Sequence, residues 1–337
     1  MRCDLSNRGV AVLGGGGDTK GEGWSAICLP LTLLATSMIL KALFQFLIFP
    51  GFLFTIIFGL FLTWIDRKIT ARIQWRKGPP FYQPYADALK LLLKETLVPE
   101  GVPRFIFLFS PLLGLMGVII AAVILLSGQF SFTGDLIVII YLFALPAIAV
   151  IIGGSASRNP LSAIGASREM TLYFGYELPF LLSLLTVVIK SGSIRISDIL
   201  LYQENFGPIL YSFSGILAFI IALFSIQAKL GFVPFDISEA EQEIMAGPFL
   251  EYSGISLLFF KLMRAGMLFL LPVFLIILFW GGIRTPWVIL KFLFILILLI
   301  LLKNTNPRLR IDQALKFFWT ILTALGILAV ILAFNRL

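Results

Sequence analysis

Histidine is absent from this sequence of 337 residues, and cysteine occurs only twice, at Cys3 and Cys28. Iron–sulfur clusters use about four cysteine ligands, haem needs an axial side chain, and zinc sites draw mainly on cysteine and histidine. We therefore expect the chain to bind no redox cofactor and no metal, so that any electron transfer belongs to partner subunits. Two isolated cysteines give no disulfide framework, and we expect free thiols.

Charged residues are also scarce, at 13% of the chain, whereas hydrophobic residues make up 59%. A soluble globular protein has about 45–50% apolar and about 25% charged residues. This apolar excess does not fit inside a soluble core, so the bilayer must be the solvent for most of the chain. The net charge of +8 comes from basic residues in loops between apolar runs, a pattern typical of membrane topology, and we expect no nucleic-acid binding.

Apolar runs long enough to cross a bilayer as helices recur along the chain. We expect an all-α, polytopic membrane bundle of about eight transmembrane helices, some of them long and tilted, with amphipathic segments on the cytoplasmic side. The expected spans are residues 44–65, 105–127, 136–152, 172–189, 209–228, 253–281, 287–302 and 317–334.

These spans form one transmembrane domain over residues 44–337, with loops at 66–104, 154–171, 229–252 and 303–313. Basic residues concentrate in the first, second and fourth of these loops, which the positive-inside rule places on the cytoplasmic side of the cell membrane. Residues 1–43 are a tail with an uncertain apolar segment at 24–40, which extends the first helix, lies at the interface or is removed in the cell.

The segment after the first span mixes basic, acidic and aromatic residues. It breaks at Gly78-Pro79-Pro80 and continues as an amphipathic stretch over residues 83–95. One interpretation is an interfacial helix anchored by basic residues, and another is a docking platform for a cytoplasmic subunit. We favour docking because charges of both signs stand among aromatic residues. The expected docking residues are Asp66, Arg67, Lys68, Arg72, Arg76 and Lys90.

Two glutamates near the start of the fourth span suggest a polar route into the membrane. Glu169, Tyr173 and Glu177 follow one another at intervals of four residues, so they share one broad helix face. Glu177 lies inside the apolar span, where a carboxylate is costly and usually faces a polar cavity or a partner. The alternative is a structural ion pair with Arg168 or Lys229, and we favour a proton or ion pathway.

Carboxylates crowd the segment between the fifth and sixth spans, at Asp236, Glu239, Glu241, Glu243 and Glu251. Ser238 followed three residues later by Glu241 has the pattern of a capping box, which explains part of this charge. Carboxylates packed this densely repel one another, and repulsion raises pKa values. We therefore expect some of these groups to exchange protons near neutral pH.

Two basic residues, Lys261 and Arg264, lie three positions apart in the expected sixth span and hence on one side of a helix. Charges that face lipid are expensive, so we expect both to face the bundle, where they can pair with the glutamates.

These segments together resemble the heel subunit of respiratory complex I, the subunit that holds the quinone site in that complex. They also resemble its homologues in energy-converting membrane-bound nickel–iron (NiFe) hydrogenases and in sulfur-reducing complexes. Pro234-Phe-Asp-Ile-Ser-Glu-Ala-Glu241 is similar to the family's Pro-Phe-Asp-x-Pro-Glu-Ala-Glu, and Glu251-Tyr-Ser-Gly254 to its Glu-Tyr-Ser-Gly. Asp66-Arg67-Lys68 resembles its Glu-Arg-Lys/Arg, and the segment starting at Pro307 resembles its Pro-Arg-x-Arg-x-Asp-Gln.

Two departures favour the hydrogenase branch over the quinone-using one. Quinone-using members carry a longer Gly-Pro-Asn-Arg-x-Gly-Pro loop where this chain has Gly78-Pro79-Pro80. They also carry Glu-Thr-Asn-Arg before the Pro-Phe-Asp motif, where this chain has Lys229-Leu-Gly-Phe-Val233.

The resemblance implies a coupling subunit of a ferredoxin-linked respiratory complex of the membrane-bound hydrogenase type. Its partners would be cytoplasmic hydrogenase-like large and small subunits with a NiFe centre, an iron–sulfur subunit, and antiporter-like membrane subunits that move H⁺ or Na⁺. Changes in the redox arm would pass to those subunits through the glutamates named above.

Other interpretations remain open. The same subunit could serve a membrane-bound sulfane-sulfur reductase or a quinone-reducing relative of complex I. A stand-alone secondary transporter is a different class, often marked by inverted repeats and broken helices that are not obvious here. A passive membrane anchor would use the carboxylates only structurally.

Overall fold

The computed structural model describes residues 40–127, 131–245, 247–282 and 286–335. It divides into two compact units, Met1–Phe44 and Gln45–Leu337. Every regular element in the described part of the chain is helical, which confirms the expected all-α class. Both cysteines and residues 24–39 of the uncertain apolar segment lie outside the described residues.

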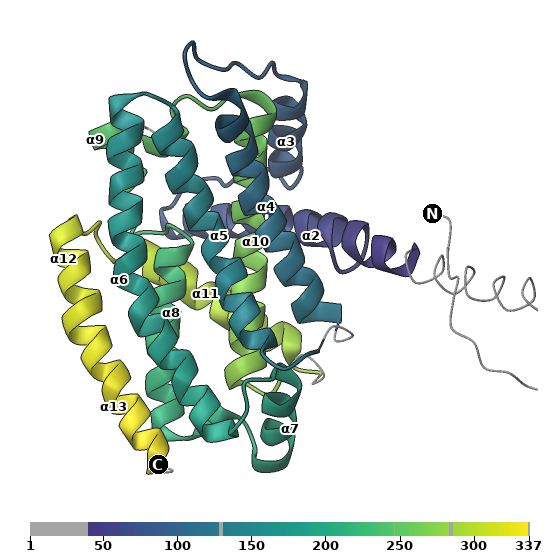
Figure 1. The fold of residues 1–337 in the computed structure, drawn as a ribbon, viewed down its shortest axis with the longest axis vertical. Helices are drawn as coiled ribbons and strands as arrows, with labels where there is room; N and C mark the ends of the chain where they lie inside the picture. Colours follow the sequence, from purple (N-terminus) through teal and green to yellow (C-terminus); the bar gives the residue numbers. More distant parts are fainter. Residues whose placement is uncertain (1–39, 128–130, 246, 283–285, 336–337) are drawn as a thin grey trace, which may run out of the picture. The chain divides into compact units, whose positions relative to one another are not determined.

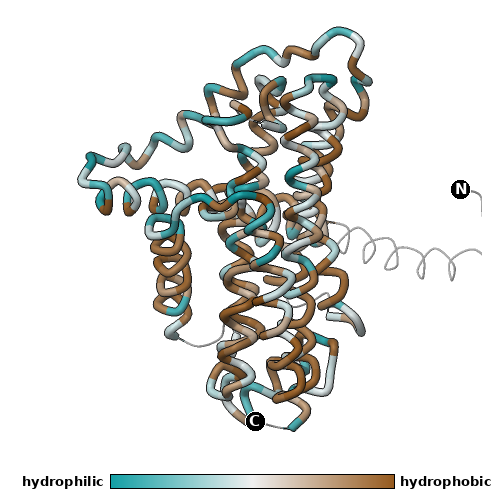
Figure 2. The backbone as a smooth tube through the Cα atoms, turned by 90° about the vertical axis from the view of Figure 1, so that its left-hand side faces the viewer, coloured by the Kyte–Doolittle hydropathy of each residue, from teal (hydrophilic) through white to brown (hydrophobic). Residues whose placement is uncertain are grey.

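Seven helices in the described residues are long and apolar enough to cross a membrane: Leu40–Ile73, Arg104–Ser127, Asp135–Ala156, Pro160–Ser191, Gly254–Phe279, Val288–Thr305 and Ile311–Phe334. An eighth apolar helix, Phe213–Lys229, is shorter. Its 17 residues extend about 25 Å at 1.5 Å per residue, slightly less than the hydrocarbon thickness. Figure 2 shows that hydrophobic residues dominate these helices. The chain is therefore a multi-pass membrane protein.

The larger unit contains the labelled helices of Figure 1. They are α2 (Phe52–Ile73), α3 (Gln83–Leu93), α4 (Arg104–Ser127), α5 (Asp135–Ala156), α6 (Pro160–Ser191), α7 (Ile196–Phe206), α8 (Phe213–Lys229), α9 (Glu241–Ile244), α10 (Gly254–Phe279), α11 (Val288–Thr305), α12 (Ile311–Lys316) and α13 (Thr323–Phe334). Short 3-10 turns lie at Ile209–Tyr211 and Gly247–Phe249, and a π-helical turn, Phe317–Leu322, joins α12 to α13.

Helix α10 is the centre of this unit. In its most apolar stretch 94% of the residues are buried, because α2, α4, α8 and α11 all pack against it. A helix that is apolar on every side belongs in the interior of a bundle. The helices α4, α5, α6 and α8 run beside one another in Figure 1, whereas α2 crosses them.

The crossing of α2 and α10 depends on small residues. A Cβ atom at Gly59 would lie 2.5 Å from the carbonyl oxygen of Ala265 and 3.0 Å from the nitrogen of Gly266. Membrane helices use small residues in this way to bring their backbones close together, because packing rather than water exclusion holds them. Gly59 thereby fixes the position of α2, whose far end carries the expected docking residues.

Two helices extend beyond the expected apolar spans. Helix α6 begins at Pro160, after an N-cap in which the Asn159 side chain accepts a hydrogen bond from Leu161 N at 2.9 Å, so most of the expected loop 154–171 is helical. Helix α2 continues to Ile73 and carries the first docking residues on its last turns. Polar side chains on both extensions bond with neighbouring segments. These bonds stabilise the helical turns that lie outside the apolar spans.

Candidate functional site

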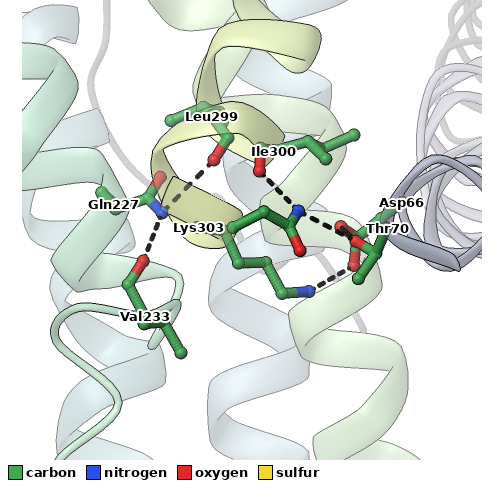
Figure 3. Close-up of polar contacts among 8 residues, drawn as sticks. Asp66, Thr70, Gln227, Val233, Leu299, Ile300 and Lys303 are labelled. Carbon is green, nitrogen blue, oxygen red and sulfur yellow. Dashed lines mark hydrogen bonds and ion pairs between the residues drawn. The ribbon is translucent and has the colours of Figure 1, made fainter. Parts of the chain in front are cut away.

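The acidic loop between α8 and α10 is fixed from two sides. The Gln227 side-chain amide at the end of α8 donates to the carbonyl oxygens of Val233, at 2.8 Å, and Leu299, at 3.4 Å (Figure 3). Phe235 is buried, with its ring centroid 4.7 Å from that of Phe318. The next residue, Asp236, is thereby held at the surface of the bundle.

Three of the expected carboxylates each meet an arginine from another segment. Asp236 accepts from Arg308 at 2.6 Å, and Glu243 accepts from Arg168 on α6 at 2.6 Å. Glu239 pairs with Arg264 on α10, where one hydrogen bond measures 2.5 Å.

At Glu243 the ion pair outweighs repulsion from the other acids, so this carboxyl is not one of the groups whose pKa is raised. Its hydrogen bond and ion pair with Arg168 hold the pKa of the Glu243 carboxyl below its ordinary value. The arginines come from distant parts of the chain, so the sequence spacing of the carboxylates alone does not reveal the pairing.

A buried ion pair lies deeper in the bundle. Lys229 Nζ donates to Glu177 Oε2 at 2.5 Å, and only 1% of the lysine side chain is exposed. The ammonium group also lies 5.0 Å from the Tyr176 ring centroid and 4.6 Å from that of Phe180. Glu177 therefore makes the structural pair that the sequence left open as an alternative, which leaves its part in a pathway untested.

Glu169 lies between the loop and this buried pair. Its carboxylate hydrogen-bonds with Ser238 and lies close enough to Arg264 and Asp236 to feel their charges. The expected capping role of Ser238 is wrong, because α9 begins at Glu241 with Ala240 as an N-cap that makes no side-chain bond. The Ser238 hydroxyl instead supports Glu169.

A small cavity connects these layers. It has a volume of about 30 Å³ and is lined by Glu169, Lys229 and Arg264, together with apolar residues of α5 and α10. A cavity of this size with several polar groups is large enough for about one water molecule. Glu169 and Arg264, which interact with the acidic loop, thus share one cavity with Lys229 of the buried pair.

A second ion pair, in which only the aspartate is buried, joins α2 to α11. Lys303 Nζ donates to Asp66 Oδ2 at 2.7 Å, and Asn304 donates to Thr70 Oγ1 at 3.3 Å (Figure 3). The Lys303 ammonium lies 4.4 Å from the ring centroid of Phe232 in the acidic loop. Asp66 is therefore buried against α11 rather than presented to an incoming partner.

The other expected docking residues lie on α2, α3 and the segment between them. Arg67 pairs with Asp87 of α3 at 3.2 Å. Partial burial acts to raise the pKa of Asp87, but hydrogen bonds from Gln83 and Arg67 outweigh it and hold the pKa below its usual range. The exposed docking residues are Arg67, Arg72, Arg76 and Lys90, whereas Lys68 is half-buried.

A cavity of about 290 Å³ opens between α2, α3, α10 and the start of the acidic loop. Charged residues of both signs line it with apolar ones: Asp66, Arg67, Asp87, Lys261 and Arg264. Lys261 is exposed on α10, so it does not turn into the bundle as Arg264 does.

The last motif residues secure the start of α10 to α4 and α6. Glu251 accepts a hydrogen bond from Asn159 at 2.6 Å. The Tyr252 ring stacks on Phe107 with centroids 4.1 Å apart, and its hydroxyl lies 3.2 Å from the Ser110 hydroxyl. Burial raises the pKa of Tyr252 to about 12.

The structure thus gathers Glu169, Asp236, Glu239, Glu243 and Arg264 around the acidic loop, with Glu177 in the neighbouring buried pair. Glu251 instead bonds with Asn159, and Lys261 lines the larger cavity. Glu241 begins α9, and its side chain lies outside the described part. The sequence did not single out Asp87, Lys303 or Arg308 as site residues. Lys303 directly follows the seventh expected span, and Arg308 lies in the Pro-Arg-x-Arg segment. These positions are the signals that could have indicated a role for the two residues.

Among the described residues no group of three or more histidine, cysteine, aspartate and glutamate side chains is arranged to hold a metal ion. The described site consists of ion pairs and hydrogen bonds, with aromatic rings against Lys229, Lys303 and Arg264.

Comparison with known proteins identifies the family. The family model described as NADH dehydrogenase matches residues 45–334. The H subunit of the NADH-quinone oxidoreductase of Thermomicrobium roseum is 36% identical over 82% of this chain and 91% of the relative. The same protein of Geobacillus thermodenitrificans is 33% identical over 79% of this chain and 86% of the relative.

A solved structure shows the same fold. The chain superposes with a TM-score of 0.75 and 27% identity on a chain of the membrane-bound sulfane sulfur reductase, an archaeal respiratory membrane complex. The match covers 83% of this chain and 96% of the other. This chain therefore belongs to the NADH dehydrogenase family of membrane subunits, which includes the H subunit of NADH-quinone oxidoreductase, and it is the corresponding membrane subunit of a multi-subunit respiratory complex.

Proposed function

We propose that this chain is a coupling subunit, which docks a cytoplasmic redox arm and relays the energy of its reaction to H⁺ or Na⁺ translocation by antiporter-like membrane subunits. The observation that supports this is the charged series running from the exposed Arg168–Glu243 pair, through Glu169, to the buried Lys229–Glu177 pair. A change at the loop can alter these interactions in turn.

The buried Lys229–Glu177 pair offers the sharpest test. Breaking a buried pair by removing one partner costs about 3–5 kcal/mol, whereas replacing both partners with apolar groups is often neutral or stabilising. We expect Glu177→Leu alone to destabilise the assembled complex, and the double variant Glu177→Leu with Lys229→Met to recover most of its thermal stability. Ion translocation by the double variant in proteoliposomes should still fail, because no charge remains to relay.

The same measurement separates coupling from anchoring. A passive anchor would regain ion translocation together with stability in the double variant, and that outcome would reject the coupling role. Ser183→Ala, one to two turns along α6 from Glu177, is a matched control, because this buried hydroxyl bonds only within its own helix in the described contacts, at 2.6 Å to Phe180 O. A stand-alone transporter would move ions without any redox subunits.

For the arm itself we propose the ferredoxin-linked, membrane-bound hydrogenase type, with iron–sulfur clusters and a NiFe centre in partner subunits. The short Gly78-Pro79-Pro80 break and the Lys229–Val233 segment support this assignment. A related sulfane-sulfur reductase arm is the near alternative, given the structural similarity to a subunit of such a complex.

A quinone-reducing complex is the second candidate. The cavity of about 290 Å³ between α2, α3 and α10 favours it, together with the curated relatives from NADH-quinone oxidoreductases. The purified complex distinguishes the three arms directly. With reduced ferredoxin as electron donor, formation of hydrogen from protons supports the hydrogenase type. Formation of sulfide from polysulfide supports the sulfur reductase, and formation of quinol supports the quinone-reducing complex.

A further inference from the structure

A large apolar opening lies apart from the charged residues discussed so far. It is a chamber of about 870 Å³ between α2, α4, α7, α10 and α11. Aromatic side chains form one wall, with Phe58 packed against Phe269 at 4.9 Å and against Phe292 at 6.3 Å between ring centroids. Its volume is in the upper part of the range of about 300–1,000 Å³ for pockets that enclose small molecules.

The chamber communicates with the surroundings of the bundle. Ile289 and Leu293 on α11 line it, and they are 74% and 39% exposed. Helix α11 is one of the candidate membrane spans, so hydrocarbon rather than water surrounds these residues. Lipid chains are therefore the apolar molecules with direct access.

One end of the chamber is polar. Ser127, Ser131, Asp135 and Ser197 line this end, near the end of α4 and the starts of α5 and α7. The Ser127 hydroxyl is buried and has no hydrogen-bond partner among the described residues. Arg195 donates from Nε to Ser131 Oγ at 2.9 Å, which places a guanidinium beside this end.

We propose that the chamber holds one acyl chain of a bilayer phospholipid, with the headgroup at the polar end beside Ser127 and Arg195. An aromatic and aliphatic lining matches the hydrocarbon chain. Guanidinium and hydroxyl groups are suitable donors for a phosphate or ester oxygen. The lipid fills the space between α2 and the neighbouring helices α10 and α11. It thereby supports α2 beside the contact between α2 and α10.

A volume-filling variant tests this site. We expect Leu293→Trp, which projects a larger ring at the chamber, to lose one phospholipid equivalent when the intact complex is examined by native mass spectrometry after detergent extraction. Ile297→Trp is the matched control, because Ile297 lies one turn further along α11, is 43% exposed and does not line the chamber. Equal lipid counts in the wild type and both variants would overturn the proposal.

A photoreactive residue gives an independent result should Leu293→Trp fail to assemble. Benzoylphenylalanine in place of Phe58, irradiated in the native membrane, should form an adduct whose mass equals that of a phospholipid. An adduct with an isoprenoid quinone, or a cross-link to a protein segment, would show another occupant and overturn the assignment.

Discussion

At the residue scale, similar ion pairs in this chain differ in how much they contribute to the stability of the folded protein. The exposed Arg168–Glu243 pair is of a type that contributes little net stability, so its main effect is to orient the acidic loop on α6. The buried Lys229–Glu177 pair cannot be broken cheaply, since a lone charge would remain among Tyr176 and Phe180.

The ionisation of Glu243 gives a pH-dependent prediction. Because Arg168 lowers the pKa of Glu243 in the folded protein, their pair is fully present above the ordinary glutamate value of about 4.3 and is lost as the pH falls through the lowered pKa. We expect the carboxyl ¹³C signal of Glu243 to titrate below the ordinary range. Arg168→Gln should move its midpoint upward, and an unchanged midpoint would contradict the pairing.

Tyr252 allows a prediction about packing at the start of α10. Tyr252→Phe keeps the stack on Phe107 but removes the hydroxyl contacts with Ser110 and the Phe107 carbonyl, and we expect a loss of about 0.5–1.5 kcal/mol of stability. Tyr252→Ala also removes the ring and should cost about 3–5 kcal/mol. Thermal unfolding of the purified complex would measure both losses, and equal effects would show that the ring contributes nothing.

Residue type could be predicted from the sequence, but residue partners could not. Glu177 and Asp236 are recognisable because a carboxylate at or inside an apolar span is expensive and hence informative. Asp66 finds Lys303 across a sequence separation of 237 residues, which no local spacing reveals. The mistaken capping role of Ser238 has the same origin, because the hydroxyl bonds with Glu169 on another helix instead of with its own segment.

At the element scale, the position of α2 depends on how closely it approaches α10. Any side chain at Gly59 must displace backbone atoms of Ala265. A Cβ at Gly175 of α6 would approach closely only the end of the Leu315 side chain, at 3.1 Å, with Phe318 at ordinary contact distance. Backbone has no alternative rotamer, so the two helical glycines should respond differently to the same change.

We therefore expect Gly59→Ala to destabilise the complex by roughly 1–3 kcal/mol through overpacking. Gly175→Ala should be nearly neutral, because a small shift of Leu315 makes room and alanine favours the helix. The midpoints of thermal unfolding compare the two variants on the same scale. Equal midpoints would mean that the α2–α10 crossing tolerates a wider separation.

Helix identity was predictable to a larger extent than helix ends. Runs of about 20 apolar residues leave few alternatives in a bilayer, so the spans follow from composition. The start of α6 at Pro160 did not follow, because its first turns are polar and become stable only beside the acidic loop. Helix α7 was also missed, since no apolar run marks its 11 residues.

At the scale of the whole molecule, the exposed basic residues of α2, α3 and their connection form a surface suited to an acidic partner. We expect Arg72→Gln with Arg76→Gln to weaken attachment of the redox arm, so that it dissociates at lower salt during purification, because charges at an interface rim control association and salt dependence. Lys190→Gln, which changes a basic residue in the last turn of α6, is the control. Equal salt resistance of both variants would exclude this surface as the docking site.

One unbroken helix, α6, carries Arg168 near its beginning and Glu177 further along. The separation of nine positions between them corresponds to about 14 Å along the helix axis. The helix is continuous from Arg168 to Glu177, although Pro179 cannot donate the hydrogen bond to the Gly175 carbonyl and so allows a bend close to Glu177. If the redox arm pulls on Arg168, we expect the displacement to reach the interior as a turn or slide of the first part of this helix, without any ion having to travel the distance.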